Sequence, residues 1–294
     1  MTTLGETIKI YLPDGQPDGV KVVEKLGWTG RALQVPRPQW ADRRARDEFG
    51  RPGVYVLTGP RDDGGALAEV YVGEGETPRR RIDDHQSNKP FWTHVTLFTS
   101  SDDNLNKAHL RYLESRLIVL ATAAGRARLD NGTAPSAPPL AEPEIAYAEQ
   151  FLRNMLLIYP IVGIDAFDVP VRDDHAETAD LLHISGPSCE GTGRETSGGF
   201  TVYAGSCGRR ALAPSTANAV IVLRRDLEEN GIVVADGESV RVTRDFEFSS
   251  PSQAAAFLLA RPANGREEWR DGSGASLNDR AARILADGGP NEYP

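Results

Sequence analysis

The sequence predicts an α+β protein, in which small antiparallel sheets and helices occupy separate stretches of the chain. Short β-like runs joined by turns rich in Gly, Asp and Pro predict paired strands. Elsewhere, apolar residues recur at three- and four-residue steps, which is typical of helices that pack on one face. With 294 residues, the chain is long enough for two compact domains whose cores need no disulfides.

The first 50 residues are expected to form a β-rich N-terminal extension. Two β-like runs, residues 8–12 and 20–23, lie on either side of the turn-rich segment 13–19.

The core is expected over residues 51–132 and begins with strands. Residues 53–57 and 69–73 are separated by a Gly- and Asp-rich turn, which is the pattern of a β-hairpin, and residues 94–99 fit a third strand.

Two helices are expected in the same core. Thr77 and Pro78 supply an N-cap and a first-turn proline, which predicts a helix over residues 79–85. A second helix is expected over residues 105–123. Its apolar stripe consists of Leu110, Leu113, Leu117 and Leu120.

Residues 133–199 are expected to form an acidic helical connector. The proline-rich segment 130–144 leads into an apolar helix over residues 145–158. Residues 185–199 are rich in Gly and Ser, which favours a mobile linker or an exposed loop.

A second small α+β domain is expected over residues 200–294. The expected elements are a strand at 200–204, a helix at 217–229 and a strand pair within 240–248. The last clear helix begins with a capping box, in which Ser250 is the cap and Gln253 lies three residues later.

Acidic charge is concentrated in one part of the chain. The net charge is -9, and residues 132–199 hold 3 basic against 11 acidic side chains. The remaining segments are close to neutral, so they can carry the basic patches that contact with phosphates requires.

The sequence predicts a cytoplasmic protein that does not enter a membrane. No apolar run approaches the ~20 residues that span a bilayer, and no basic segment followed by an apolar stretch opens the chain. Cys189 and Cys207 lie in no Cys/His cluster, so we expect reduced thiols and no structural zinc.

Five residues of the core could together carry phosphodiester chemistry. Tyr55 and Tyr71 fall on the two hairpin strands, which can bring both phenols to one pocket. Arg81 and His85 are four residues apart and share a helix face, and Glu114 lies at the edge of an apolar stripe. Taken singly, each is more often structural, as a strand aromatic or an ion-pair partner. Their order and spacing favour a shared site with a base, a cation and a metal-binding carboxylate.

These residues resemble the GIY-YIG nucleases. GVY at residues 53–55 and YVG at residues 71–73 match the two halves of the family's name, with valine for isoleucine in each. The family's arginine, histidine and glutamate match Arg81, His85 and Glu114. The resemblance covers about residues 51–131 and implies a small antiparallel three-stranded sheet flanked by helices.

The resemblance also implies a one-metal mechanism. Glu114 binds a divalent ion, Mg2+ or Mn2+, that contacts the scissile phosphate, and Arg81 stabilises the pentacovalent transition state. A tyrosine acts as the base, Tyr55 as first choice with Tyr71 in support, and His85 accepts its proton. An ordinary tyrosine pKa of about 10 requires that cations or a histidine relay assist.

DNA is the expected partner, and basic side chains near the site are the expected contacts. The family's downstream asparagine has its nearest counterpart in Asn131. The expected DNA-binding residues are Arg43, Arg44, Arg79, Arg80, Lys107, Arg111 and Asn131. Trp40 lies among arginines and could stack on bases or complete a core.

The flanking segments resemble a longer subset of the same family, in which an uncharacterised domain closes the chain. The matching pieces are IKIYLPDGQPDGV, LDNGTAPSAPPL, FLRNMLLIYPIVGI, FTVYAGS and SPSQAAAFLLARPANGREEW. The last is also similar to a domain associated with restriction enzymes and adenine methylases, which implies a role in target choice. The alternative is a structural domain whose Trp269 completes a core.

A metal-dependent DNA endonuclease, acting in restriction, phage defence or repair, is therefore the expected function. A catalytically silent DNA-binding or regulatory protein on the same scaffold and an RNA-processing nuclease are the alternatives. One active site cuts one strand, so a double-strand break would need a homodimer or sequential nicks.

Overall fold

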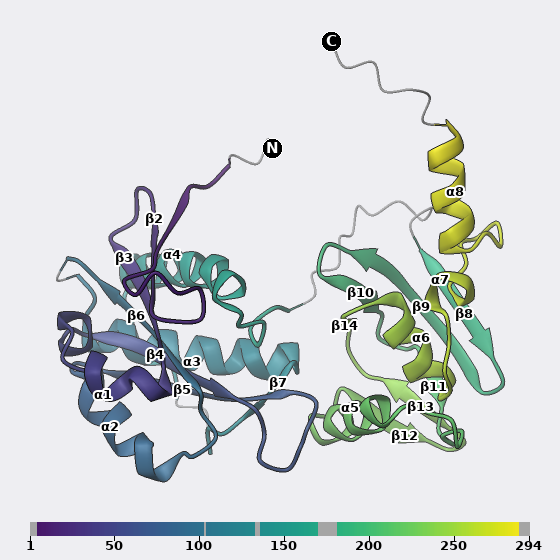
Figure 1. The fold of residues 1–294 in the computed structure, drawn as a ribbon, viewed down its shortest axis with the longest axis horizontal. Helices are drawn as coiled ribbons and strands as arrows, with labels where there is room; N and C mark the ends of the chain where they lie inside the picture. Colours follow the sequence, from purple (N-terminus) through teal and green to yellow (C-terminus); the bar gives the residue numbers. More distant parts are fainter. Residues whose placement is uncertain (1–4, 103, 133–135, 170–180, 288–294) are drawn as a thin grey trace. The chain divides into compact units, whose positions relative to one another are not determined.

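The computed structural model describes residues 5–102, 104–132, 136–169 and 181–287, and it confirms the α+β class (Figure 1). The chain divides into two compact units, Met1–Asp168 and Val169–Pro294.

The first unit is built on a seven-stranded sheet. In spatial order its strands are β1 (Ile8–Tyr11), β2 (Lys21–Lys25), β3 (Gly30–Pro36), β6 (His94–Ser100), β4 (Gly53–Gly59), β5 (Ala68–Gly75) and β7 (Ala127–Leu129). All neighbours are antiparallel except β5 and β7, which run parallel. The three strands predicted for the core are present, but the expectation of a three-stranded sheet is wrong, because the N-terminal strands continue it.

Strand β3 was not predicted, although it joins the N-terminal extension to the core. It pairs with β6 along its whole length, from Gly30 opposite Ser100 to Pro36 opposite His94. Most of its residues are buried, because both faces of the sheet are covered there. A strand covered on both faces lacks the polar alternation by which a half-exposed strand is recognised.

Alternate residues of each strand face two different hydrophobic layers. Val54 and Val56 of β4 pack beneath α3 (Lys107–Ala124) and α4 (Glu142–Ile158). Tyr55 and Leu57 point to the opposite layer. That layer also holds side chains from α1 (Trp40–Arg43), η2 (Asp47–Gly50) and α2 (Pro78–Asn88).

The two predicted core helices are confirmed. Helix α2 begins at Pro78, but the expected cap bond is absent, because the Thr77 side chain makes no capping hydrogen bond. Asn106 caps α3 by accepting from Ala108 and His109, and Gly125 ends that helix with a φ of 63°. The apolar stripe of α3 packs into the core and leaves Glu114 half-buried.

Two tryptophans near basic residues are core side chains. Trp40 and Trp92 are 2% and 1% exposed, and Trp40 donates to Asp83 at 2.9 Å. Stacking of Trp40 on a base is therefore excluded in this fold.

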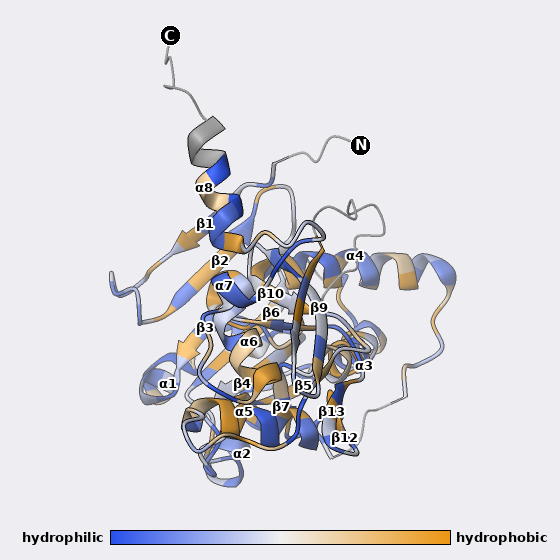
Figure 2. Cartoon of the chain, turned by 90° about the vertical axis from the view of Figure 1, so that its right-hand side faces the viewer, coloured by the Kyte–Doolittle hydropathy of each residue, from blue (hydrophilic) through white to orange (hydrophobic). Residues whose placement is uncertain are grey.

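The predicted connector helix is α4, and it begins earlier than expected, at Glu142. Hydrophilic and hydrophobic bands alternate along it (Figure 2), because one side packs on the sheet and the other faces outward. Helix α4 belongs to the first unit. The predicted domain boundary at residue 132 therefore lies inside one compact unit and not between two.

The second unit contains another seven-stranded sheet. The strands follow the order β12 (Val233–Asp236), β13 (Ser239–Val242), β11 (Cys207–Arg209), β9 (Cys189–Thr196), β10 (Gly199–Val202) and β14 (Phe246–Phe248), and β8 (Leu182–Gly186) also pairs with β9. The helices are α5 (Asn218–Glu229), α6 (Pro251–Leu259), α7 (Gly265–Glu268) and α8 (Leu277–Asp287).

The predicted linker over residues 185–199 is wrong, because this segment contains the end of β8 and all of β9. Its glycines allow close packing. A Cβ at Gly191 would lie 2.7 Å from the Leu258 side chain, and one at Gly193 would lie 2.4 Å from the Thr201 carbonyl oxygen. The glycine content of this segment therefore suggested flexibility, whereas in the fold these glycines let neighbouring atoms lie close to the backbone.

The helix predicted after Ser250 is α6. Its Ser250 hydroxyl accepts from the Gln253 backbone at 3.2 Å, as a capping box requires. In a capping box the Gln253 side chain would accept from the backbone N–H of Ser250. Here it accepts from the backbone N–H of Ser249, at 3.0 Å. Trp269 is fully buried, in accord with its alternative reading as a core residue.

Candidate active site

The candidate site lies along the partly open edge of β5. Strand β7 pairs with β5 only from Ala68 to Val70. Further along β5, among the described residues, side chains and not a neighbouring strand bind the outward backbone groups. The Asn131 side chain accepts from the Val72 N–H at 3.0 Å and donates to the Val72 carbonyl at 2.8 Å. Arg81 donates to the next outward carbonyl, that of Glu74, at 3.0 Å.

This arrangement gives Asn131 a structural task. Both ends of its carboxamide bind the backbone of Val72, so the side chain imitates a continuing strand at an unprotected edge. Within the protein, Asn131 supports the strand that carries Tyr71, and its contact with DNA stays a prediction.

A cavity of about 710 Å³ opens beside this edge. Its lining includes Tyr71 from β5, Arg81 from α2 and Glu114 from α3, so three of the five predicted catalytic residues face one space. Other residues that line it are Glu74, Arg111, Asn131, Gly132, Ser136, Ala137, Pro138 and Pro139.

Tyr55 and His85 lie directly behind Tyr71. The Tyr55 side chain is fully buried, and its hydroxyl lies 3.0 Å from His85 Nε2. The His85 ring meets the Tyr71 ring edge-on, with 4.8 Å between centroids. Gly73 makes room for this arrangement, because a Cβ there would lie 2.5 Å from the Tyr55 hydroxyl.

The environment keeps both members of this pair neutral. Burial, together with the charges of Lys89 and Arg81, lowers the pKa of His85 to about 4. Burial raises the pKa of Tyr55 far above its ordinary value, and repulsion from Tyr71 adds to this. At neutral pH the His85 ring is therefore uncharged.

Arg81 links the strand edge to the phenol of Tyr71. Besides its bond to Glu74, it donates to the Tyr71 hydroxyl at 3.4 Å. Burial alone would lower the pKa of its guanidinium, but the oxygens of the two tyrosines and of Glu114 outweigh this and raise the pKa. Arg81 thus stays charged while it faces the cavity.

Glu114 has an available carboxylate. Within the described residues it has neither a hydrogen bond nor an ion pair, which removes the alternative that it merely pairs with Arg111. Burial raises the pKa of the Glu114 carboxyl and the Glu74 charge raises it further, while Arg81 and other cations oppose both effects.

Sequence reasoning missed Glu74. It is 5% exposed, and both of its carboxylate oxygens accept from Lys107 at 2.8 Å. Lys107 thus forms an ion pair within the protein, and its contact with DNA stays a prediction. The position of Glu74, directly after YVG on a buried strand, was the signal that could have drawn attention to it.

Lys89 and Asp130 were also missed. The Lys89 ammonium lies 4.0 Å from the centre of the Tyr71 ring and forms an ion pair with Asp130. Lys89 directly follows α2, and no local pattern indicates that it reaches a residue of β5.

Three of the arginines predicted to bind DNA make contacts within the protein. Arg43 pairs with Asp14, and Arg44 pairs with Asp83. Arg79 is half-buried and donates to the Arg46 carbonyl at 3.2 Å. Arg80 and Arg111 are exposed.

The cavity suits a hard divalent ion held by a single protein carboxylate. Across the described residues, no group of three or more His, Cys, Asp or Glu side chains could enclose a metal. Mg2+ keeps several waters and is often bound by one or two carboxylates together with substrate phosphate. Glu114 fits this ligand set, whereas Lys107 already neutralises Glu74.

A comparison with family models matches residues 182–281 to the Domain of unknown function (DUF4357). No curated protein and no solved structure matches the chain. The matched segment lies in the second unit, begins before the predicted boundary at residue 200, and contains none of the five candidate catalytic residues. In the part of the chain that the structure covers, no helix has the length and apolar character needed to cross a membrane.

Proposed function

We propose that the chain is a metal-dependent endonuclease of the GIY-YIG type that hydrolyses phosphodiester bonds in DNA. One observation carries the proposal: Tyr71, Arg81 and Glu114 line the same cavity, with the Tyr55 and His85 pair directly behind Tyr71. Base, cation and carboxylate are the three kinds of group that the reaction needs.

Tyr71 is the better candidate to meet the attacking water. It is partly exposed and lines the cavity, whereas Tyr55 is fully buried. Arg81 donates to the Tyr71 hydroxyl, and Lys89 lies over the Tyr71 ring. Tyr55 then positions His85, whose neutral ring lies edge-on to the Tyr71 ring.

Arg81 stabilises the charge that develops on the phosphorus oxygens, because its guanidinium is already oriented by the strand edge. Glu114 would hold one Mg2+ or Mn2+. When bound, such an ion polarises the scissile phosphate and neutralises charge on the leaving oxygen.

The test is a cleavage assay with purified full-length protein. Supercoiled plasmid, phage DNA carrying modified bases, and RNA are incubated with Mg2+, Mn2+ or EDTA. We expect metal-dependent nicking of DNA, and Glu114→Gln should slow it by at least about 100-fold, the typical effect of removing one transition-state contact.

Glu142→Gln is the matched control, because Glu142 is an exposed carboxylate on α4. Equal cutting by Glu114→Gln and the control would contradict the proposed site. Cutting of RNA alone would move the substrate class to RNA, and no cutting of any substrate would favour a silent DNA-binding role.

A further inference from the structure

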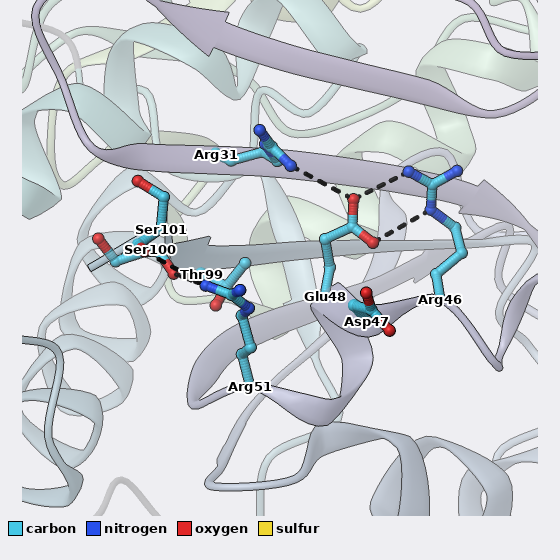
Figure 3. A pocket seen from close by; sticks show the side chains of 8 residues that line it. All are labelled: Arg31, Arg46, Asp47, Glu48, Arg51, Thr99, Ser100 and Ser101. Atoms are coloured by element: carbon cyan, nitrogen blue, oxygen red, sulfur yellow. Dashed lines mark hydrogen bonds and ion pairs between the residues drawn. The ribbon is translucent and has the colours of Figure 1, made fainter. Parts of the chain in front are cut away.

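A second charged cavity lies in the first unit, away from the candidate active site. It has a volume of about 510 Å³ and is lined by side chains from the ends of β3 and β6 and from the segment around η2. Its residues are Arg31, Arg46, Asp47, Glu48, Arg51, Thr99, Ser100 and Ser101 (Figure 3).

Two of its three arginines are oriented by one buried carboxylate. Glu48 is 7% exposed and lies between Arg46 and Arg31 (Figure 3). Arg46 donates to its two oxygens at 2.8 and 3.2 Å, and Arg31 lies 3.6 Å from it. Arg31 also forms an ion pair with Glu24, so carboxylates fix both guanidiniums and pair with both charges.

Arg51 supplies a further positive charge. Its guanidinium donates to the carbonyls of Ser100 and Ser101 at 3.4 and 3.3 Å, and it forms no ion pair with a carboxylate among the described residues. The lining also contains three hydroxyl side chains, those of Thr99, Ser100 and Ser101. Thr99 donates to the Pro52 carbonyl, Ser100 to Asp102 and Ser101 to the Thr29 carbonyl, so the fixed guanidiniums are the donors that remain for a phosphate.

The cavity lies at the same end of the sheet as the candidate active site. In one row across the sheet, Gly75 pairs with Gly53, Gly53 with Thr99, and Thr99 with Arg31. Three strand spacings separate β5 from β3, or roughly 14 Å. Measured along the axis of a duplex, this distance is about four base pairs.

Helix α2 connects the two cavities physically. Arg79 holds the Arg46 carbonyl and so braces the segment that carries Glu48, whereas Arg81 faces the candidate active site. Between them in sequence, Arg80 is exposed. The first turn of α2 thus lies between the two cavities.

We propose that the cavity formed by Arg31, Arg46 and Arg51 binds a backbone phosphate of the nucleic acid whose scissile phosphate lies at Glu114. This inference rests on the proposed nuclease function. It adds a backbone contact at the ends of β3 and β6, where no DNA-binding residue was predicted from the sequence.

The test measures binding separately from cleavage. Full-length Glu114→Gln protein is titrated against a fluorescein-labelled duplex without divalent metal, at several salt concentrations. We expect Arg51→Ala to weaken binding roughly tenfold at low salt and to reduce the salt slope by about one. Ser101→Asp, which places a negative charge in the intact cavity, should weaken binding as well, and Arg51→Lys should restore part of the affinity.

Arg153→Ala is the matched control, because Arg153 is an exposed arginine on α4, over the opposite face of the sheet. It removes the same charge and should bind like the parent. If the protein with Glu114 intact cuts DNA while, in the Glu114→Gln background, Arg51→Ala and Ser101→Asp bind as tightly as Arg153→Ala, the phosphate cavity is refuted and the nuclease function stands. A parent that neither binds nor cuts nucleic acid refutes both.

Discussion

Tyr55 and Tyr71 have the same side chain but very different surroundings. Tyr55 is enclosed by β5 and α2 and bonds to His85, whereas Tyr71 meets the cavity and two cations. Gly73 is the residue that permits this difference, since any side chain there would displace the Tyr55 phenol. The final glycine of YVG therefore has a steric explanation within this fold.

His85 should make folding stability depend on pH. Its pKa is about 4 in the folded chain, against an ordinary value of about 6.5. As the pH falls below 6.5 the unfolded chain takes up this proton first, so the stability present above that pH is lost progressively toward pH 4. We expect the urea midpoint of the parent to fall more between pH 7 and pH 5 than that of His85→Gln. Equal losses in the two proteins would show that another group is responsible.

The residues that meet at the candidate site could be predicted further than the contacts that support them. The order and spacing of Tyr71, Arg81 and Glu114 suggested a shared pocket before any fold was known. Glu74 and Lys89 act through partners 33 and 41 residues away, Lys107 and Asp130. Such partners become neighbours only through the pairing of β5 and the packing of α2 and α3.

At the level of the element, the first turn of α2 shows how a run of identical residues can divide into different roles. Arg79 supports η2, Arg80 is exposed, and Arg81 faces the cavity. Consecutive helical residues point about 100° apart, so the side chains of three neighbours lie in three different environments. A count of positive charges treats them as one patch.

Arg79 and Arg80 should therefore differ in their effect on stability. Arg79→Ala removes a hydrogen bond from a charged donor and should lower the free energy of unfolding by about 1.5–3 kcal/mol. Arg80→Ala should change it by less than about 0.5 kcal/mol, as an exposed substitution usually does. Urea unfolding followed by circular dichroism measures both, and similar values would show that the Arg79 contact does not support the fold.

The second unit shows where composition misleads at the element level. Residues 185–199 have the glycine and serine content of a linker, yet they form strands against α6 and β10. A local window cannot distinguish glycine that confers freedom from glycine that admits a neighbour. The difference lies in residues such as Leu258, which is more than 60 positions away.

For the whole molecule, the division between units falls after Asp168, and no predicted boundary lies there. Local turns suggested a break near residue 50, but Leu33 and Val35 of β3 are fully buried in the same core as Tyr55. The pairing of β3 with β6 spans about sixty residues of sequence, so only the folded sheet reveals it.

A fragment of residues 1–168 should fold by itself and retain DNA cutting, because it contains all five candidate catalytic residues and both cavities. A fragment of residues 51–132 should not fold, since removing β3 exposes one side of β6 and opens the core. Circular dichroism, thermal melting and the plasmid assay compare the two fragments. A cooperative melt from residues 51–132 would contradict this division.

The position of β6 also determines when the first sheet can be completed during translation. β3 and β4 do not pair with each other, and each pairs with β6, which is made later. A nascent chain that ends before His94 thus carries two separate antiparallel groups, β1 to β3 and the β4–β5 hairpin. Only when residues 94–100 leave the ribosome can the two groups become one sheet, so the N-terminal strands must stay soluble until then.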